Sequence, residues 1–156
     1  ALHSKQKLVA RLADGTEFVP HVIEIAFGVD RPVFALCDLF YSKREEDEKR
    51  TLLTFPPRMA PIQVAVFPLL NKDGLDEKAE ALHKTLETKF LTYYDDSGSI
   101  GKRYSRMDAV GTPYCITIDH DTLTKNDVTV RERDSMKQER VQILELEHYL
   151  KERLLR

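Results

Sequence analysis

Residues 92–115 read TYYDDSGSIGKRYSRMDAVGTPYC and hold the end of a strand, a loop and a helix. Two tyrosines close a short apolar run, and the Asp-Asp-Ser-Gly-Ser segment after them is rich in residues that favour turns. From Ile100 onward, apolar residues recur at helical spacing, which predicts a helix packed on a sheet. This order of strand, loop and helix indicates an α/β fold.

The predicted helix has an apolar face and a basic face. Ile100, Tyr104 and Met107 share the apolar face at helical spacing. We expect the opposite face to be basic and to point outward, with an extension on a later strand: Lys102, Arg103 and Arg106, then Arg131 and Arg133. This face is either solvated without a partner or a surface that contacts an RNA backbone.

A nucleotide site in the loop is a further interpretation. Backbone N–H groups and a helix N-terminus can hold an anion. Gly98 and Gly101 give only GxxG, which is far short of a phosphate-binding fingerprint, and Asp95 and Asp96 would repel a phosphate. The pattern therefore disfavours this interpretation.

Working outward, the sequence predicts five strands in the C-terminal two thirds. The expected strands are 63–69, 90–94, 114–118, 127–133 and 139–143, and the expected helices are 76–90, one from about 100, and 144–155. The alternation predicts an α/β fold with a mixed five-stranded sheet and flanking helices, in which helical crossovers join parallel strands beside an antiparallel portion.

The N-terminal third reads differently. Residues 7–13 and 16–24 predict a β-hairpin around Asp14-Gly15, and residues 30–41 predict a helix with a buried apolar face. The charged run 43–50 predicts a solvated loop. Three prolines in 52–61 predict a linker or domain boundary.

Composition limits the function classes. The chain has 156 residues, 42% hydrophobic content and a net charge of -2, so one domain or one domain plus part of another is expected, without a whole-chain basic field. Cys37 and Cys115 lie far apart, so we expect reduced, buried cysteines in a cytosolic protein and no thiolate zinc site.

Asp119-His120-Asp121 predicts a turn rather than a metal site. Neither a membrane span nor a secretory signal is visible, and the start at Ala1 rather than Met predicts a fragment or a processed chain.

Three segments resemble a known enzyme family. VPHVIEIAFGVDRPVFAL (19–36) resembles motif 3 of class II aminoacyl-tRNA synthetases. DDSGSIGKRYSRMDAVGTPYCITID (95–119) and VRERDSMKQERV (130–141) resemble the C-terminal anticodon-binding domain of glycyl-tRNA synthetases of archaeal and eukaryotic type. The resemblance implies two parts: a C-terminal remnant of the catalytic domain in residues 1–55, which supplies the hairpin and first helix, and an anticodon-binding domain in residues 56–156.

The resemblance also implies residue roles. Glu24 matches the glutamate that binds the ammonium group of glycine, and Arg31 matches the arginine that contacts an ATP phosphate. Ala26 stands where the family has a serine that helps hold glycine. Asp108-Ala109-Val110-Gly111 replaces the family's Asp-Glu-Ile-Gly. The basic residues at 102, 103, 106, 131 and 133 are expected to face tRNA.

The implied reaction joins glycine to ATP and then to the 3′ end of its tRNA. Motifs 1 and 2, which supply most of the adenylate site, are not in the chain, so we expect it to be catalytically incomplete and to bind neither ATP nor a metal alone. The complete enzyme would use ATP with Mg²⁺, act as a homodimer in the cytoplasm and bind tRNA-Gly, not DNA or a membrane. The alternatives are a repurposed stand-alone module that binds RNA or a protein, and a nucleotide-binding α/β protein, which would bind ATP tightly.

Overall fold

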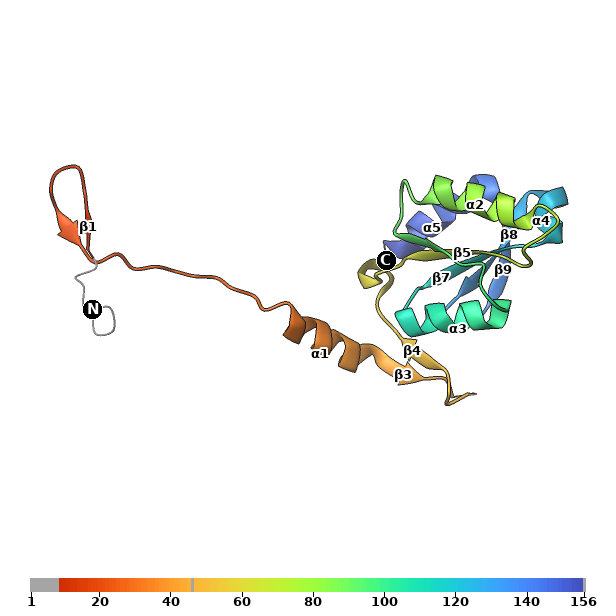
Figure 1. Ribbon diagram of the computed structural model, residues 1–156, viewed down its shortest axis with the longest axis horizontal. Coiled ribbons are helices and arrows are strands. Elements are labelled where there is room, and N and C mark those ends of the chain that lie inside the picture. Colours follow the sequence, from red (N-terminus) through yellow and green to blue (C-terminus); the bar gives the residue numbers. More distant parts are fainter. Residues whose placement is uncertain (1–8, 46, 156) are drawn as a thin grey trace. The chain divides into compact units, whose positions relative to one another are not determined.

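The main feature of the computed structural model is a mixed five-stranded sheet (Figure 1). The structure describes residues 9–45 and 47–155. The strands lie in the order β6 (Thr92–Tyr94), β5 (Val64–Pro68), β7 (Tyr114–Ile118), β8 (Asp127–Glu132) and β9 (Gln138–Gln142). β5 is parallel to β6 and β7, whereas β7–β8 and β8–β9 are antiparallel. The predicted fold class is confirmed.

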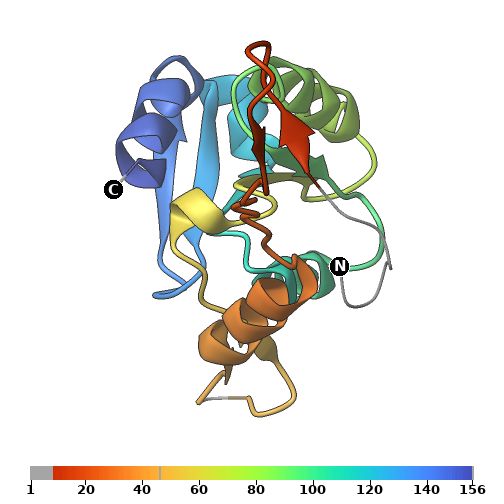
Figure 2. The same cartoon turned by 90° about the vertical axis from the view of Figure 1, so that its left-hand side faces the viewer.

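Helices pack on both faces of this sheet. α2 (Leu75–Leu86) and α5 (Ile143–Leu154) pack on one face, and α3 (Ile100–Val110) packs on the other; Figure 2 shows the same grouping, with α2 and α5 above and α3 below. All residues of β5 and β7 are buried, because helices cover these central strands from both sides. Leu146, Leu150 and Leu154 recur at helical spacing along α5, and all three are buried.

α3 packs through the predicted apolar face and stops at a glycine. Met107 is buried, with Ile100 and Tyr104 partly buried beside it. Gly111 ends the helix with φ +89°, and a Cβ there would lie 2.8 Å from Phe55 Cδ2 and 2.9 Å from the Leu53 carbonyl oxygen. Both the backbone conformation and the close approach of the preceding segment therefore require glycine.

Residues 41–60 are packed, which corrects two predictions. β3 (Tyr41–Lys43) and β4 (Thr51–Leu53) form an antiparallel hairpin, followed by the 3₁₀ turn η1 (Pro57–Met59). The expected solvated loop contains Arg44, which is only 8% exposed, and the expected linker contains the buried residues Leu52, Phe55 and Ala60. These apolar residues on either side of Pro56 and Pro57 bury their side chains, so this segment does not behave as a linker.

Two further elements differ in detail from their predictions. α2 was expected over 76–90, but it follows Gly74, which has φ +76°, and ends at Leu86, with Asp76 in its first turn. Asp119-His120-Asp121, expected as a turn, instead begins the short helix α4 (His120–Lys125). Asp119 starts α4 through a reciprocal capping box with Thr122, which explains why a helix forms there.

The chain divides into two compact units, residues 1–33 and 34–156. In the first unit, β1 (Ala10–Arg11) and β2 (Glu17–Phe18) form the predicted hairpin, although the strands are shorter than expected. Gly15 occupies the turn with φ +86°. Expected strand residues 7 and 8 lie outside the described part of the chain.

α1 (Asp30–Phe40) forms where the sequence predicted a helix, but its apolar face is not buried. Val33 is 51% and Phe34 75% exposed. Along this face only Leu36 and Phe40 are partly buried, and the Phe40 ring packs against Phe55 with 5.5 Å between the centroids. The prediction of a buried face is therefore wrong for most of α1.

The cysteines are also placed differently from the expectation. Cys115 is buried, and burial raises the pKa of its thiol to about 12, but Cys37 is exposed. No helix within the described ranges has the length and apolarity that a membrane span needs.

Candidate functional site

Asp95 shapes the loop between β6 and α3. Its Oδ1 accepts hydrogen bonds from the N–H and hydroxyl of Ser97 at 2.9 and 2.8 Å, and its Oδ2 accepts one from Arg106 Nε at 2.9 Å. Burial raises the pKa of Asp95, but these hydrogen bonds and the Arg106 charge outweigh it and hold the pKa below its ordinary value. Asp95 therefore anchors the loop.

Arg103 closes the same loop from inside. Its guanidinium donates to four backbone carbonyls, those of Pro68, Asp96, Ser97 and Gly98, and the residue is 3% exposed. The prediction that Arg103 points outward is wrong, because the loop folds over it. Only Lys102, which is exposed, and Arg106, whose side chain is 42% exposed, carry positive charge to the surface of α3.

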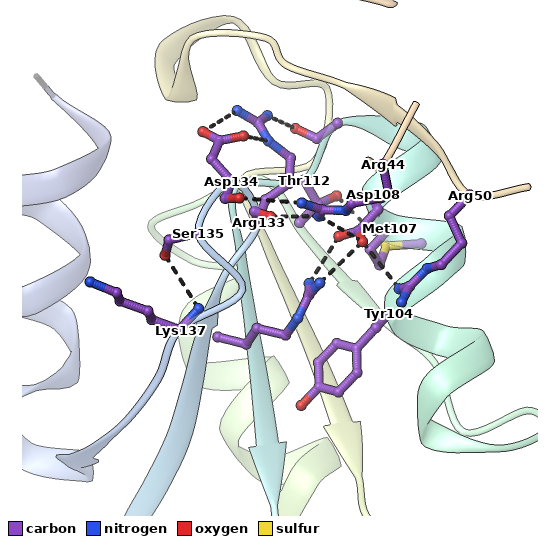
Figure 3. Close-up of polar contacts among 12 residues, drawn as sticks. Arg44, Arg50, Tyr104, Met107, Asp108, Thr112, Arg133, Asp134, Ser135 and Lys137 are labelled. Atoms are coloured by element: carbon purple, nitrogen blue, oxygen red, sulfur yellow. Dashed lines mark hydrogen bonds and ion pairs between the residues drawn. The ribbon is translucent and has the colours of Figure 1, made fainter. Parts of the chain in front are cut away.

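Asp108 gathers three arginines around one buried carboxylate (Figure 3). Arg131 donates to Oδ1 and Oδ2 at 2.9 and 3.1 Å, while Arg44 and Arg50 donate to Oδ2 at 2.9 and 3.2 Å. Arg131 also lies over the Tyr104 ring, 4.8 Å from its centroid. The cluster joins α3, β8 and the β3–β4 hairpin.

The Asp108 cluster (Arg44, Arg50, Asp108, Arg131) carries an excess of positive charge. The Nε atoms of Arg44 and Arg50 are buried, and no described residue accepts a hydrogen bond from either. Arg50, with a side chain 29% exposed, brings this charge toward solvent. Buried charges of one sign raise the local potential, which favours an anionic partner at the surface above.

Arg133 is buried beside this cluster. It donates to the carbonyls of Phe55 and Gly111 at 3.0 and 2.8 Å and to both oxygens of Asp134 at 2.7 and 2.9 Å. The prediction that Arg131 and Arg133 extend an exposed basic face is therefore wrong. Both guanidiniums point into the domain and hold its segments together.

The open part of the sheet lies beside α3, on β8 and β9. In the cross-strand register, Thr117 faces Thr129, and Thr129 faces Arg140. Thr117 is bonded to the Tyr104 hydroxyl at 2.6 Å, so this row lies on the α3 side of the sheet. α3 packs mainly on β4 and β5, and three side chains of β9 are exposed on the uncovered part: Gln138, Arg140 and Gln142.

Arg140 is fixed in place on this open face. It donates to Asp119 Oδ2 at 2.5 Å, to Thr129 Oγ1 at 3.0 Å and to Asp127. The Arg140 hydrogen bond is the main cause that lowers the pKa of Asp127. This row of side chains was not predicted from the sequence. Side chains alternate between the two faces of a strand, and Val141 is apolar and buried. This alternation would have placed residues 138, 140 and 142 together on the face opposite to Val141.

A cavity of about 410 Å³ lies where α3 begins, lined among others by Asn71, Ser99 and Arg103. Asn71 donates to the Asp96 carbonyl, and the Arg103 donors are committed to carbonyls. The cavity therefore offers no free guanidinium for a phosphate, which disfavours the nucleotide interpretation. In the ranges that the structure describes, no cluster of His, Cys, Asp or Glu suits a metal.

Glu24, Ala26 and Arg31 are exposed and lie within the unit 1–33. Glu24 and Ala26 belong to an extended segment that pairs with no strand among the described residues. Their roles toward glycine and ATP stay predictions.

Residues 63–153 match the family model of the anticodon binding domain. This chain belongs to that family. The fold agrees, because the RNA-binding domain of threonyl-tRNA synthetase from Cryptosporidium parvum superposes with a TM-score of 0.58 and 21% identity, over 64% of this chain and 25% of that one.

Glycine–tRNA ligases resemble this anticodon-binding domain and the segment before it. The ligase of Methanococcus vannielii is 47% identical over 95% of the chain, and that of Clostridium acetobutylicum is 49% identical over 88%. The chain spans 25% and 30% of the length of these two relatives. The predicted resemblance to glycyl-tRNA synthetases is confirmed.

Proposed function

We propose that this chain is the tRNA-recognising, C-terminal part of a glycine–tRNA ligase. The observation that carries the proposal is the 47% identity to such a ligase over 95% of the chain, beyond the 63–153 match to the anticodon family. The Asp108 cluster and the open face of β8–β9 support it, because they offer positive potential beside uncovered polar side chains.

The open face suits unstacked bases of an anticodon. Side-chain amides at Gln138 and Gln142 present both a donor and an acceptor to a base edge, and Arg140 between them is held rigidly. In this proposal Lys102 and Arg106, the two exposed cations of α3, meet backbone phosphates. Three further residues were expected from the sequence to contact tRNA but are buried. In this proposal they position other groups instead: Arg103, Arg131 and Arg133.

Residues 1–55 would then be the end of the catalytic domain and 56–156 the anticodon-binding domain. Exposed Ile23, Ile25, Phe27 and Val29 alternate as a strand that lacks a sheet, which supports a missing structural partner. In this proposal Glu24 binds the ammonium group of glycine, and Arg31 binds an ATP phosphate. Ala26 has no hydroxyl, so the glycine loses the contact that the family's serine would make. The complete enzyme would be a cytoplasmic homodimer that uses ATP with Mg²⁺, and this chain alone would not aminoacylate.

Binding of the chain to a tRNA-Gly transcript tests the proposal, with an anticodon-substituted transcript as comparison at one fixed salt concentration. We expect the native anticodon to be preferred by about 1–3 kcal/mol per recognised base. Arg140→Ala should reduce this preference. Lys84→Ala, at an exposed position of α2, is the matched control and should leave the preference unchanged.

Equal affinity for both transcripts would overturn anticodon reading by this chain. If the chain does not bind tRNA, even when the upstream part of the ligase is joined to it, the result would favour the repurposed module. Tight ATP binding by the chain alone would favour the nucleotide-binding alternative.

A further inference from the structure

A second cavity lies on the other face of the sheet, the face that carries α5. It measures about 460 Å³ and lies between β7–β8–β9 and the last turns of α5. Its walls combine aromatic and charged side chains around an apolar floor: Tyr114, Val130, Glu132, Lys137, Glu139 and Arg153, with Gln138 and Tyr149. A volume of this size fits a small organic ligand.

Tyr114 gives the cavity an unused polar group. The residue is 6% exposed, and it lines the cavity. No described residue hydrogen-bonds to its hydroxyl, which is also not among the fully buried unpartnered atoms. The hydroxyl is therefore open to the cavity, where it can donate or accept a hydrogen bond with a ligand.

Tyr149 forms a rigid aromatic wall. Its hydroxyl donates to Glu139, and the Arg153 guanidinium stacks over its ring at 3.6 Å from the centroid. Burial, followed by the Glu139 carboxylate, raises the pKa of Tyr149, so the hydroxyl stays a donor. A ring that is already fixed loses little entropy when a planar ligand packs beside it.

Charge decides between ligand classes. Two cations, Lys137 and Arg153, line the cavity together with two carboxylates, Glu132 and Glu139, so the cavity has no net positive charge that would favour a bare anion. Arg153 is ion-paired with Glu139 at 3.8 Å. The Lys137 side chain has no ion-pair partner among the described residues, and it points away from the Asp108 cluster, toward the α5 side (Figure 3). One free cation beside aromatic, donor and acceptor groups suits a nucleoside monophosphate, with its base against the tyrosines and its phosphate at Lys137.

We propose that this cavity binds one unstacked nucleotide, on the face of the sheet opposite the open face of β8–β9. The nucleotide belongs either to an RNA strand or to the free pool. The site goes beyond anticodon reading, since Gln138 is the one residue of the open face that also borders the cavity, and Thr129, Arg140 and Gln142 do not line it.

Titration of the full chain with AMP, CMP, GMP and UMP, followed by NMR of the tyrosine rings, tests the site. At least one nucleotide should bind and shift the rings of Tyr114 and Tyr149. Tyr114→Phe should bind it about 3–10-fold more weakly, by the loss of one hydrogen bond. Its thermal stability should be unchanged, because the lost hydroxyl has no partner to leave behind. Tyr93→Phe, an exposed tyrosine on β6, is the matched control and should bind normally.

Further arms separate the outcomes. A single-stranded RNA that binds more tightly than any mononucleotide and competes with it identifies RNA as the source, while weaker binding identifies the free pool. Arg140→Ala should weaken tRNA binding but leave mononucleotide binding intact, so this site and the proposed function fail separately. The site is overturned if no nucleotide shifts these rings, if Tyr114→Phe binds like wild type, or if inorganic phosphate binds equally well.

Discussion

Asp108 and Arg131 form a two-point ion pair inside the domain, with Nη1 2.9 Å from Oδ1 and Nη2 3.1 Å from Oδ2. Asp108 is fully buried, and the Arg131 side chain is 4% exposed. Arg44 ties the β3–β4 hairpin to the same carboxylate. One carboxylate therefore couples the segment before residue 63 to the family domain that begins there.

Asp108→Asn should destabilise the domain strongly. The change keeps the shape but removes the only acidic member of the cluster, and it leaves the charges of Arg44 and Arg131 buried without compensation. Breaking a buried pair in this way costs about 3–5 kcal/mol. Urea unfolding measures the loss. Asp121→Asn, on an exposed pair with Lys125, should change stability little, and an equal effect of both substitutions would contradict the assignment.

Arg103→Lys should loosen the loop between β6 and α3 even though it keeps the charge. A lysine ammonium cannot reproduce the planar fork that serves the carbonyls of Pro68, Asp96 and Gly98. We expect a loss of about 2–4 kcal/mol, because several charged hydrogen bonds are broken. Hydrogen exchange of the loop amides and urea unfolding measure it. Lys102→Arg, at the exposed neighbouring position, should leave both unchanged.

Gly111→Ala should destabilise the junction of α3 with β4. The added Cβ would meet Phe55 and Leu53, and an L-residue is strained at φ +89°. The two effects together predict a loss of about 2–4 kcal/mol in thermal or urea unfolding. Gly101→Ala is the matched control: it lies in α3 with nothing within 4 Å of the new Cβ, so it should stabilise by about 0.5–1 kcal/mol. Similar outcomes at both sites would contradict the packing argument.

The sheet could be predicted because its signals are local. The apolar runs at 64–68 and 114–118 and the leucine spacing of α5 each report burial within a few residues of sequence. α4 escaped prediction because its stability comes from the capping box of Asp119 with Thr122 rather than from periodicity. The packing of residues 51–60 was not predicted, because three prolines are typical of linkers whether or not the apolar residues near them are buried.

The side-chain partners could not be predicted in the same way. Arg103 looks like Lys102 and Arg106 in the sequence, yet it is consumed by carbonyls of a loop whose path is set by tertiary structure. Asp108 is paired with Arg131, 23 positions away in the sequence, and with Arg44, 64 positions away. At such separations no pattern in a single sequence indicates which side chains are in contact. Helical spacing alone therefore assigned a buried guanidinium to the surface.

The pair of Arg140 with Asp119 and Asp127 should make stability depend on pH. Burial raises the pKa of Asp119, but hydrogen bonds from Arg140 and Thr122 outweigh it, so the pKa lies below the ordinary value of 3.8. Such a carboxylate stabilises the fold above its unfolded pKa, and this stability is lost as the pH falls through the lower, folded pKa. Urea unfolding from about pH 6 to about pH 2.5 should therefore show wild type exceeding Arg140→Gln at the upper end and converging with it at the lower end. Arg58→Gln, at an exposed arginine in η1, should follow wild type throughout. A gap between wild type and Arg140→Gln that stays constant with pH would mean that Arg140 stabilises the open face by packing alone.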